Sequence, residues 1–303
     1  MQDSIITILL PVYNKKQYVG EAIASIQKQT LQNWRLLILD DGSTDGSSDV
    51  CADYSKRDKR IAVIHKSNEG LIKTLNYGLA QTKTPFVARM DADDSCHPTR
   101  LEKQLRFLEH SPEVGVCGTF YLKSDGNRTT RFLRPNTPDG IETFLLHDNP
   151  IAHGSVVARV EIIKALGGYP GHQSALHVED YALWTSLAGL TKLANVPDYL
   201  YTYRLSVQSV SYQNRELQAH NRDIIAAEYA SRMFRGGFLK RFLQPLRVYH
   251  SACSNRSEQG KRIGICLLRR SAFVAQRYQC HIDFAWRHLL ARKLFRKLRV
   301  RRL

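Results

Sequence analysis

The chain has 303 residues, of which 43% are hydrophobic and 24% charged, a composition that excludes disorder throughout and is typical of a folded globular protein. Its longest apolar stretches are far shorter than the roughly 20 residues of a membrane-spanning helix, and its acidic start, MQDSII, lacks the basic region of a secretory signal. We therefore expect a cytoplasmic location without a transmembrane anchor, and the net charge of +16 predicts an anionic partner.

Strands and helices are predicted to alternate along the first 110 residues. Apolar, β-rich runs predict strands at 5–11, 35–39, 61–65 and 86–90. Helical spacing of apolar residues predicts helices at 16–29, 47–54, 71–81 and 98–110. This alternation predicts an α/β fold with an open, mainly parallel sheet that carries helices on both faces. Ligands of such sheets bind beyond the carboxyl ends of the strands.

Two acidic clusters follow predicted strands and so fall at that edge. Asp40 and Asp41 close the second strand, and Asp91, Asp93 and Asp94 close the fourth. Carboxylates that lie close together repel unless a cation lies among them, and oxygen ligands at this spacing suit Mg²⁺ or Mn²⁺ bridging to a diphosphate. The alternative is a pair of surface turns, in which Asp and Gly are common. Neither a GxGxxG nor a GxxxxGKS motif is present, which disfavours a dinucleotide oxidoreductase and a P-loop enzyme.

Eight segments together resemble family 2 glycosyltransferases of the GT-A fold, over about residues 4–211. They are LLPVYNKKQYVGEAIASIQKQT (9–30), LLILDDGSTDGS (36–47), NEGLIKTLNYGLAQTKTPFVARMDADD (68–94), HPTRLEKQLRFL (97–108), NPIAHGSVV (149–157), GGY (167–169), VEDYALW (178–184) and YLYTYRLSVQSVS (199–211). The resemblance implies transfer of a sugar from a nucleotide-diphospho-sugar, with a UDP-sugar favoured.

The resemblance also implies roles for individual residues. Asp180 matches the catalytic base, and Asp93, with Asp91, matches the ligands of Mn²⁺ or Mg²⁺. The positions expected to bind the nucleotide-sugar are Pro11, Tyr13, Asn14, Asp41, Lys73, Asp91 and Ala92. The positions expected at the acceptor or in a secondary shell are Glu179, His153, Trp184 and Arg204. Taken singly, each has an ordinary structural alternative, such as a packing aromatic, a solvated lysine or an acid at a helix N-terminus.

In the implied reaction, an acceptor hydroxyl loses its proton to Asp180 and attacks the anomeric carbon while the metal and Lys73 neutralise the leaving diphosphate. Direct attack with one base inverts the anomeric configuration. The expected acceptor is a lipid-linked saccharide of lipopolysaccharide, capsule or exopolysaccharide biosynthesis. Two alternatives stay open: transfer to a polyprenyl phosphate, which does not need Asp180, and a binding protein for nucleotide-sugars or anionic polymers without turnover.

Two departures from the family pattern weaken secondary contacts. Many relatives carry HPSV where this chain has HGSV at 153–156, and YRxH where it has YRLS at 203–206. Ser206 replaces a histidine that would contact the diphosphate or the metal, and Arg204 or Ser206 itself could compensate. A lone histidine such as His153 is as often structural as functional.

The basic excess divides the chain into two parts. Residues 1–214 hold 23 basic and 23 acidic side chains, so the whole net charge falls in 215–303. We expect a catalytic domain at 1–214, with a nucleotide-binding half at 1–110 and an acceptor half at 111–214, followed by a helical, basic C-terminal region at 215–303. The amphipathic, basic segment 282–303 suits an anionic membrane surface, which predicts a peripheral location on the inner face of the cytoplasmic membrane.

An alternative for the basic region is a helix that packs on the catalytic domain with a solvated basic face. No nucleic-acid partner is expected, because the sequence offers no recognition motif or interleaved aromatic platform. The six cysteines are scattered and form no CxxC pair, which disfavours a zinc site or a disulfide framework and predicts free thiols.

Overall fold

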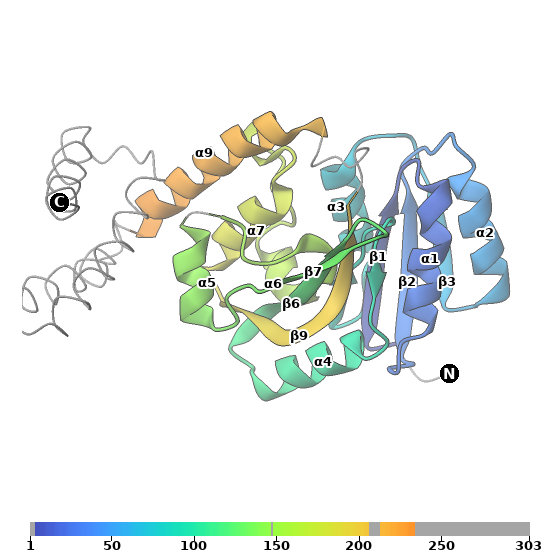
Figure 1. Cartoon of the computed structure of the whole chain (residues 1–303), viewed down its shortest axis with the longest axis horizontal. Coiled ribbons are helices and arrows are strands. Elements are labelled where there is room, and N and C mark those ends of the chain that lie inside the picture. Colours follow the sequence, from blue (N-terminus) through green and yellow to red (C-terminus); the bar gives the residue numbers. More distant parts are fainter. Residues whose placement is uncertain (1–3, 147, 206–212, 234–303) are drawn as a thin grey trace, which may run out of the picture.

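A computed structural model of the chain describes residues 4–146, 148–205 and 213–233 (Figure 1). The first half alternates as expected. Its elements are β1 (Ile6–Val12), α1 (Lys16–Gln27), β2 (Trp34–Asp40), α2 (Ser47–Arg57), β3 (Ile61–His65), α3 (Leu71–Gln81) and β4 (Phe86–Arg89). The predicted bounds of β3 and α3 are confirmed to the residue, and the other elements differ from their predicted ends by a few residues.

The second half is more irregular. Its elements are β5 (Ser95–Cys96), α4 (Arg100–His110), β6 (Val114–Ser124), β7 (Thr129–Phe132), α5 (Pro138–Leu145), a 3₁₀ turn (His153–Ser155), β8 (Val157–Arg159), α6 (Val160–Ala165), a second 3₁₀ turn (Gln173–Ala175), α7 (Glu179–Leu187), β9 (Lys192–Arg204) and α9 (Arg215–Met233).

All strands join one sheet, in the order β3-β2-β1-β4-β8-β6-β9-β5, with β7 paired to β6. The pairs β1–β2, β2–β3 and β1–β4 are parallel, as the alternation of strands and helices requires. Beyond β4 the sheet becomes mixed, because the short strand β8 is antiparallel to both of its neighbours, β4 and β6. The long strands β6 and β9 are again parallel.

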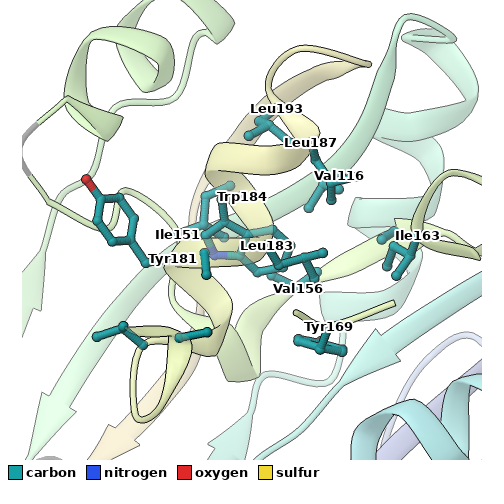
Figure 2. Close-up of a cluster of buried hydrophobic side chains, with 14 of the residues drawn as sticks. Val116, Ile151, Val156, Ile163, Tyr169, Tyr181, Leu183, Trp184, Leu187 and Leu193 are labelled. Atoms are coloured by element: carbon teal, nitrogen blue, oxygen red, sulfur yellow. The ribbon is translucent and has the colours of Figure 1, made fainter. Parts of the chain in front are cut away.

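Alternation of side chains along the strands builds a core on each face of the sheet. Ile8 and Leu10 of β1 pack with the apolar sides of α1, α2 and α4. Leu9 points to the opposite face, where α3, α5, α6, α7 and α9 cover the sheet. Figure 2 shows this second cluster, with Leu183 and Trp184 of α7 among side chains of the strands and loops. Helices therefore cover both faces, as expected for an α/β fold.

Helix α9 packs on the rest of the domain, on the side away from α1 and α2 (Figure 1). Its residues Ile225 and Tyr229 belong to the same apolar cluster as α7. Asn221 Nδ2 also donates a hydrogen bond to the carbonyl oxygen of Leu176, at 2.9 Å. The start of the predicted basic region thus shares the core of the first part, and the division at residue 214 stays a prediction.

Most of the basic region, including segment 282–303, lies outside the described residues, as does Ser206. No helix of the described residues is long and apolar enough to cross a membrane. Cys51, Cys96 and Cys117 are free thiols, as predicted for them.

Candidate functional site

The acidic turn after β4 is built around a buried ion pair. Arg89, the last residue of β4, is only 4% exposed, and its Nη2 lies 2.8 Å from Oδ1 of Asp91. Burial by itself would raise the pKa of Asp91, but the guanidinium group of Arg89 holds it below its ordinary value. Asp91 is therefore an ionised carboxylate, fixed in place at the carboxyl end of β4.

The end of β9 holds the same turn from the other side. The hydroxyl of Tyr201 donates to Oδ2 of Asp94 at 2.5 Å, and the backbone N–H of Arg204 donates to Oδ1 at 2.7 Å. The Nε of Arg204 also donates to the carbonyl oxygen of Asp93 at 2.9 Å. Burial and the charges of Asp91 and Asp93 raise the pKa of Asp94 well above its usual range. Asp94 thus shapes the turn and Arg204 contacts it, and the predicted role of Arg204 stays a prediction.

Asp93 is a second partly exposed carboxylate of this turn, beside Asp91. Its Oδ2 lies 2.6 Å from Nζ of Lys15, in the loop between β1 and α1, and the two side chains are 23% and 19% exposed. The donors are oxygen atoms only, which suits Mg²⁺ or Mn²⁺. No group of three His, Cys, Asp or Glu residues in the described part of the chain could hold a metal. A cation bound by Asp93 and Asp91 would therefore complete its ligands with water and, when a nucleotide is present, with its phosphate oxygens.

Lys15 takes the place of a cation beside Asp93, and this predicts competition. We expect Lys15→Met to tighten Mn²⁺ binding about fivefold in the absence of nucleotide, since it removes a partly exposed ion pair worth ~1 kcal/mol. Isothermal titration with MnCl₂ measures the change. The control is Lys28→Met, at an exposed position directly after α1. This variant should bind Mn²⁺ with the affinity of the wild type. Weaker Mn²⁺ binding by Lys15→Met would show that Lys15 does not compete with the cation.

A second pair of carboxylates opens helix α7. Asp180 is half-buried, its Oδ2 accepts a hydrogen bond of 2.6 Å from Nδ2 of Asn149, and its Oδ1 accepts one from the backbone of Tyr181. Burial, together with the charge of Asp91, raises the pKa of Asp180 to about 6. Burial and the neighbouring Asp180 raise the pKa of Glu179 to about 8. At neutral pH, Asp180 is therefore the ionised carboxylate of the pair, whereas Glu179 keeps its proton.

His153 lies beside this acid pair, in the 3₁₀ turn before β8. Its Nε2 is 2.9 Å from the hydroxyl of Tyr169, and its Nδ1 is 3.8 Å from Oε1 of Glu179. Burial, reinforced by Arg89, lowers the pKa of His153 to about 3, so the imidazole is neutral. Trp184 is fully buried in the core and meets His153 edge-on, with ring centroids 6.2 Å apart. Trp184 therefore packs against His153 from the core. The predicted contact of Trp184 with an acceptor stays a prediction.

Close packing at Gly154 joins the two halves of the site. A Cβ atom at this position would lie 1.8 Å from the hydroxyl of Tyr201 and 2.5 Å from Oδ2 of Asp91. The turn that carries His153 therefore rests directly on the acidic turn after β4. His153 of the same turn lies 3.8 Å from Glu179, the residue before Asp180, so one turn contacts both acidic segments.

The loops after β1 and β2 are locked together at the predicted nucleotide pocket. Asn14 adopts a left-handed backbone with φ of 51°, and its Oδ1 accepts a hydrogen bond from the backbone of Thr44 at 2.8 Å. Tyr13 beside it is 50% exposed, so its ring is free to receive a planar group. Pro11 is half-buried in β1, and Ala92 is buried in the core below the acidic turn.

Asp41, predicted at the base of the nucleotide, is 4% exposed and already engaged. Its carboxylate lies 2.5 Å from Nζ of Lys66 and accepts hydrogen bonds from the backbone of Glu69 and Gly70. Burial opposes ionisation, yet these contacts hold the pKa of Asp41 below its ordinary value. Nζ of Lys73 lies 3.9 Å from Oε1 of Glu69, and the Lys73 side chain is 71% exposed. The predicted roles of Asp41 and Lys73 stay predictions.

Sequence analysis missed several residues that organise the site. They are Lys15, Lys66, Arg89, Asn149, Tyr169 and Tyr201. A signal existed for Arg89, because a charge inside a short apolar strand needs a buried partner, and Asp91 follows it at once. Asn149 and Tyr169 gave no such signal, since their partners lie far away in the sequence.

Comparisons with known proteins agree on one family. The model of the family described as "Glycosyl transferase family 2" matches residues 7–167, more than half of the chain. The amylovoran biosynthesis glycosyltransferase AmsE of Erwinia amylovora is 32% identical over 210 residues, which cover 68% of this chain and 78% of AmsE.

Solved structures support the same fold at lower identity. TarS of S. aureus, residues 1–349 in complex with UDP, has a TM-score of 0.59 at 19% identity, covering 95% of this chain and 87% of TarS. The mannosyltransferase PcManGT of Pyrobaculum calidifontis, in complex with GDP-Man and Mn²⁺, has a TM-score of 0.57 at 16% identity, covering 99% of this chain and 76% of PcManGT.

Proposed function

Because the chain belongs to glycosyl transferase family 2 and is a glycosyltransferase of the GT-A fold, we propose that it transfers a sugar from a nucleotide-diphospho-sugar, with inversion, to a saccharide hydroxyl. One observation carries the proposal: the turn of His153 and Gly154 packs on Asp91 on one side and lies 3.8 Å from Glu179, the residue before Asp180, on the other. Asp91 suits a cation that holds a diphosphate, and Asp180 suits a proton acceptor.

In this mechanism, Asp180 accepts the proton of the acceptor hydroxyl while that oxygen attacks the anomeric carbon. Asn149 fixes the carboxylate, and the absence of a proton on it at neutral pH follows from a pKa of about 6. Asp93 and Asp91 would hold Mn²⁺ or Mg²⁺, which supplies positive charge to the leaving diphosphate. With one base and no nucleophile of the protein, the product has inverted configuration.

The donor class rests on solved relatives of the fold. TarS is described in complex with UDP and with UDP-GlcNAc, and PcManGT in complex with GDP-Man and Mn²⁺. These complexes support a nucleotide-sugar donor, and we favour a UDP-sugar. The name of AmsE, a glycosyltransferase of amylovoran biosynthesis, supports a role in polysaccharide biosynthesis. The proposed acceptor is a lipid-linked saccharide at the inner membrane face, with segment 282–303, outside the described residues, as the membrane contact.

Slow donor hydrolysis tests this function without a known acceptor. Purified full-length protein is incubated with UDP-, GDP- and dTDP-sugars, each with Mn²⁺, Mg²⁺ or EDTA, and release of the nucleoside diphosphate is measured. We expect one nucleotide class to be hydrolysed in the presence of a metal and none in EDTA. No hydrolysis of any donor by folded protein would support the alternative of a binding protein without turnover.

The pKa of Asp180 predicts the pH dependence of the reaction. Because the base must be ionised and its pKa is raised to about 6, activity is present above that pH and lost below it. We expect kcat/KM for donor hydrolysis to fall about tenfold per pH unit below pH 6. The pH profile from 4.5 to 8, with circular dichroism to confirm folding at each pH, checks this. A flat profile down to pH 5 would contradict the role of Asp180.

A further inference from the structure

Two cations meet at one aromatic ring of β6, where this strand lies between β7 and β9. Nζ of Lys123, in β6, lies 6.0 Å from the ring centroid of Tyr121, and Cζ of Arg134, just after β7, lies 5.9 Å from it. Nη2 of Arg134 also donates a hydrogen bond to the Tyr121 hydroxyl, at 3.2 Å. Both cations are half-buried. Two like charges therefore share one partly desolvated site.

Neither cation has a carboxylate partner among the ion pairs of the described residues. Lys192 of the neighbouring strand β9, by contrast, pairs with Glu142 at 3.1 Å. Asp148 acts on Lys123 only from a distance, and burial with the charge of Arg134 lowers the pKa of Lys123 overall. Like charges held together away from water cost free energy, and an anion between them would relieve that cost.

Aromatic rings frame the two cations. The rings of Tyr121 and Phe132 stack, with centroids 5.4 Å apart and an interplanar angle of 15°. Lys123 Nζ lies 4.3 Å from the centroid of Phe132 and 5.7 Å from that of Tyr203. Rings of this kind offer apolar faces against which the C–H face of a sugar can pack. The site thus combines groups for an anion with groups for a saccharide.

Hydrogen bonds from Asn195 join the segment of Arg134 to the segment that precedes the proposed base in the hydrogen-bond network. Nδ2 of Asn195 donates to the carbonyl oxygens of Pro135, at 2.6 Å, and Pro150, at 3.1 Å. Pro135 directly follows Arg134, and Pro150 directly follows Asn149, whose amide holds Asp180. Asn195 therefore joins the segment of Arg134 to the segment of Asn149, and Asn149 in turn binds Asp180 of α7.

The strand register ties the site to the acidic turn as well. Lys123 is the neighbour of Tyr203 in the β6–β9 pair. The next residue of β9, Arg204, donates its backbone N–H to Asp94. The strand pair that carries Lys123 thus leads to the acidic turn, and Arg134 lies on a segment joined to that of Asn149, in the part of the domain predicted to bind the acceptor.

We propose that Lys123 and Arg134 bind an anionic group, a phosphate or a carboxylate, carried by the acceptor saccharide. The inference rests on the proposed function, because that function places a saccharide next to Asp180. A guanidinium group suits either anion through paired hydrogen bonds, and the lysine adds a point charge. The enzyme would then select acceptors by charge as well as by sugar.

The test measures the binding of three probes to the full chain. EDTA in the buffer removes any cation from the acidic turn, and 150 mM NaCl screens charges that lie far from the site. Glucose 1-phosphate carries a phosphate, methyl glucuronide carries a carboxylate, and methyl glucoside carries neither. The test variant is Lys123→Met/Arg134→Leu. The matched control, Lys103→Met/Arg106→Leu, removes the same charges from exposed ion pairs. Lys123→Arg keeps the charge and serves as a second variant should the double variant not fold.

Wild-type protein, the control and Lys123→Arg are expected to bind at least one anionic probe ten times more tightly than methyl glucoside. The double variant should bind that anionic probe at least tenfold more weakly than the wild type does. The preferred probe tells whether the anion is a phosphate or a carboxylate. Three results would overturn the inference. A folded double variant could bind the anionic probe as tightly as the wild type, the wild type could bind methyl glucoside as tightly as the anionic probes, or Lys123→Arg could bind the anionic probe more weakly than the wild type. Donor hydrolysis is measured separately. Its absence in the wild type contradicts the proposed function, whereas hydrolysis by the double variant at the wild-type rate shows that the two substitutions affect probe binding and not the reaction with the donor.

Discussion

Asp180→Asn is expected to abolish sugar transfer while donor binding is retained. The substitution keeps the size of the side chain and an oxygen for Asn149, but it removes the group that accepts the proton. Loss of a general base costs about 10²- to 10⁴-fold in rate. We therefore expect at least a hundredfold loss of kcat for donor hydrolysis, with the donor dissociation constant unchanged within twofold. The acidic limb of the pH profile should vanish with it.

Asp53→Asn is the control for this experiment, since Asp53 is an exposed carboxylate paired only with Lys56, far from the site in the fold. The control should keep wild-type rates. An Asp180→Asn enzyme that transfers sugar to an acceptor phosphate at the wild-type rate would point to the alternative of a polyprenyl phosphate acceptor, because a phosphate is already an anion and needs no base.

Gly154→Ala should disable the site without changing any charge. The new methyl group would lie 1.8 Å from the Tyr201 hydroxyl and 2.5 Å from the Asp91 carboxylate, so the 3₁₀ turn and the acidic turn must move apart. Overpacking of this kind costs about 2 kcal/mol of stability. We also expect at least a hundredfold loss of activity, because metal ligand and base lose their alignment. Thermal unfolding and donor hydrolysis measure both effects.

Gly171→Ala is the matched control, since nothing lies within 4 Å of a Cβ atom at Gly171. That variant should be as active as wild type and no less stable. Full activity of Gly154→Ala would mean that the two turns are not coupled, and the link between Asp91 and Asp180 would lose its structural basis.

The parts of the fold that follow from local patterns were predictable. The apolar runs and helical spacings of the first 110 residues specify β1 to β4, and β3 and α3 are confirmed to the residue. The carboxylates after β4 lie at the edge of the sheet because parallel strands end there together. Arg204 could be placed at the site only through the family pattern.

Long-range packing accounts for what the sequence could not predict. Strand β8 has only three residues, too few for a periodic signal, yet it inserts between β4 and β6 and brings His153 and Gly154 onto the acidic turn. Lys15 lies 78 positions from Asp93, and no local pattern pairs them. The same holds for Lys123 and Arg134, which meet only because the β6–β7 hairpin folds back on itself.

Metal-dependent donor binding tests the central claim most directly. Isothermal titration of the wild-type chain and of Asp93→Asn with UDP-, GDP- and dTDP-sugars, in Mn²⁺ and in EDTA, separates the cation from the nucleotide. We predict that wild-type protein binds one nucleotide class at least tenfold more tightly with Mn²⁺ than with EDTA, and that Asp93→Asn loses this difference. A donor affinity that is the same with Mn²⁺ and EDTA and is unchanged in Asp93→Asn would contradict the assignment of the acidic turn to the donor diphosphate. The absence of donor binding by folded protein would contradict it as well.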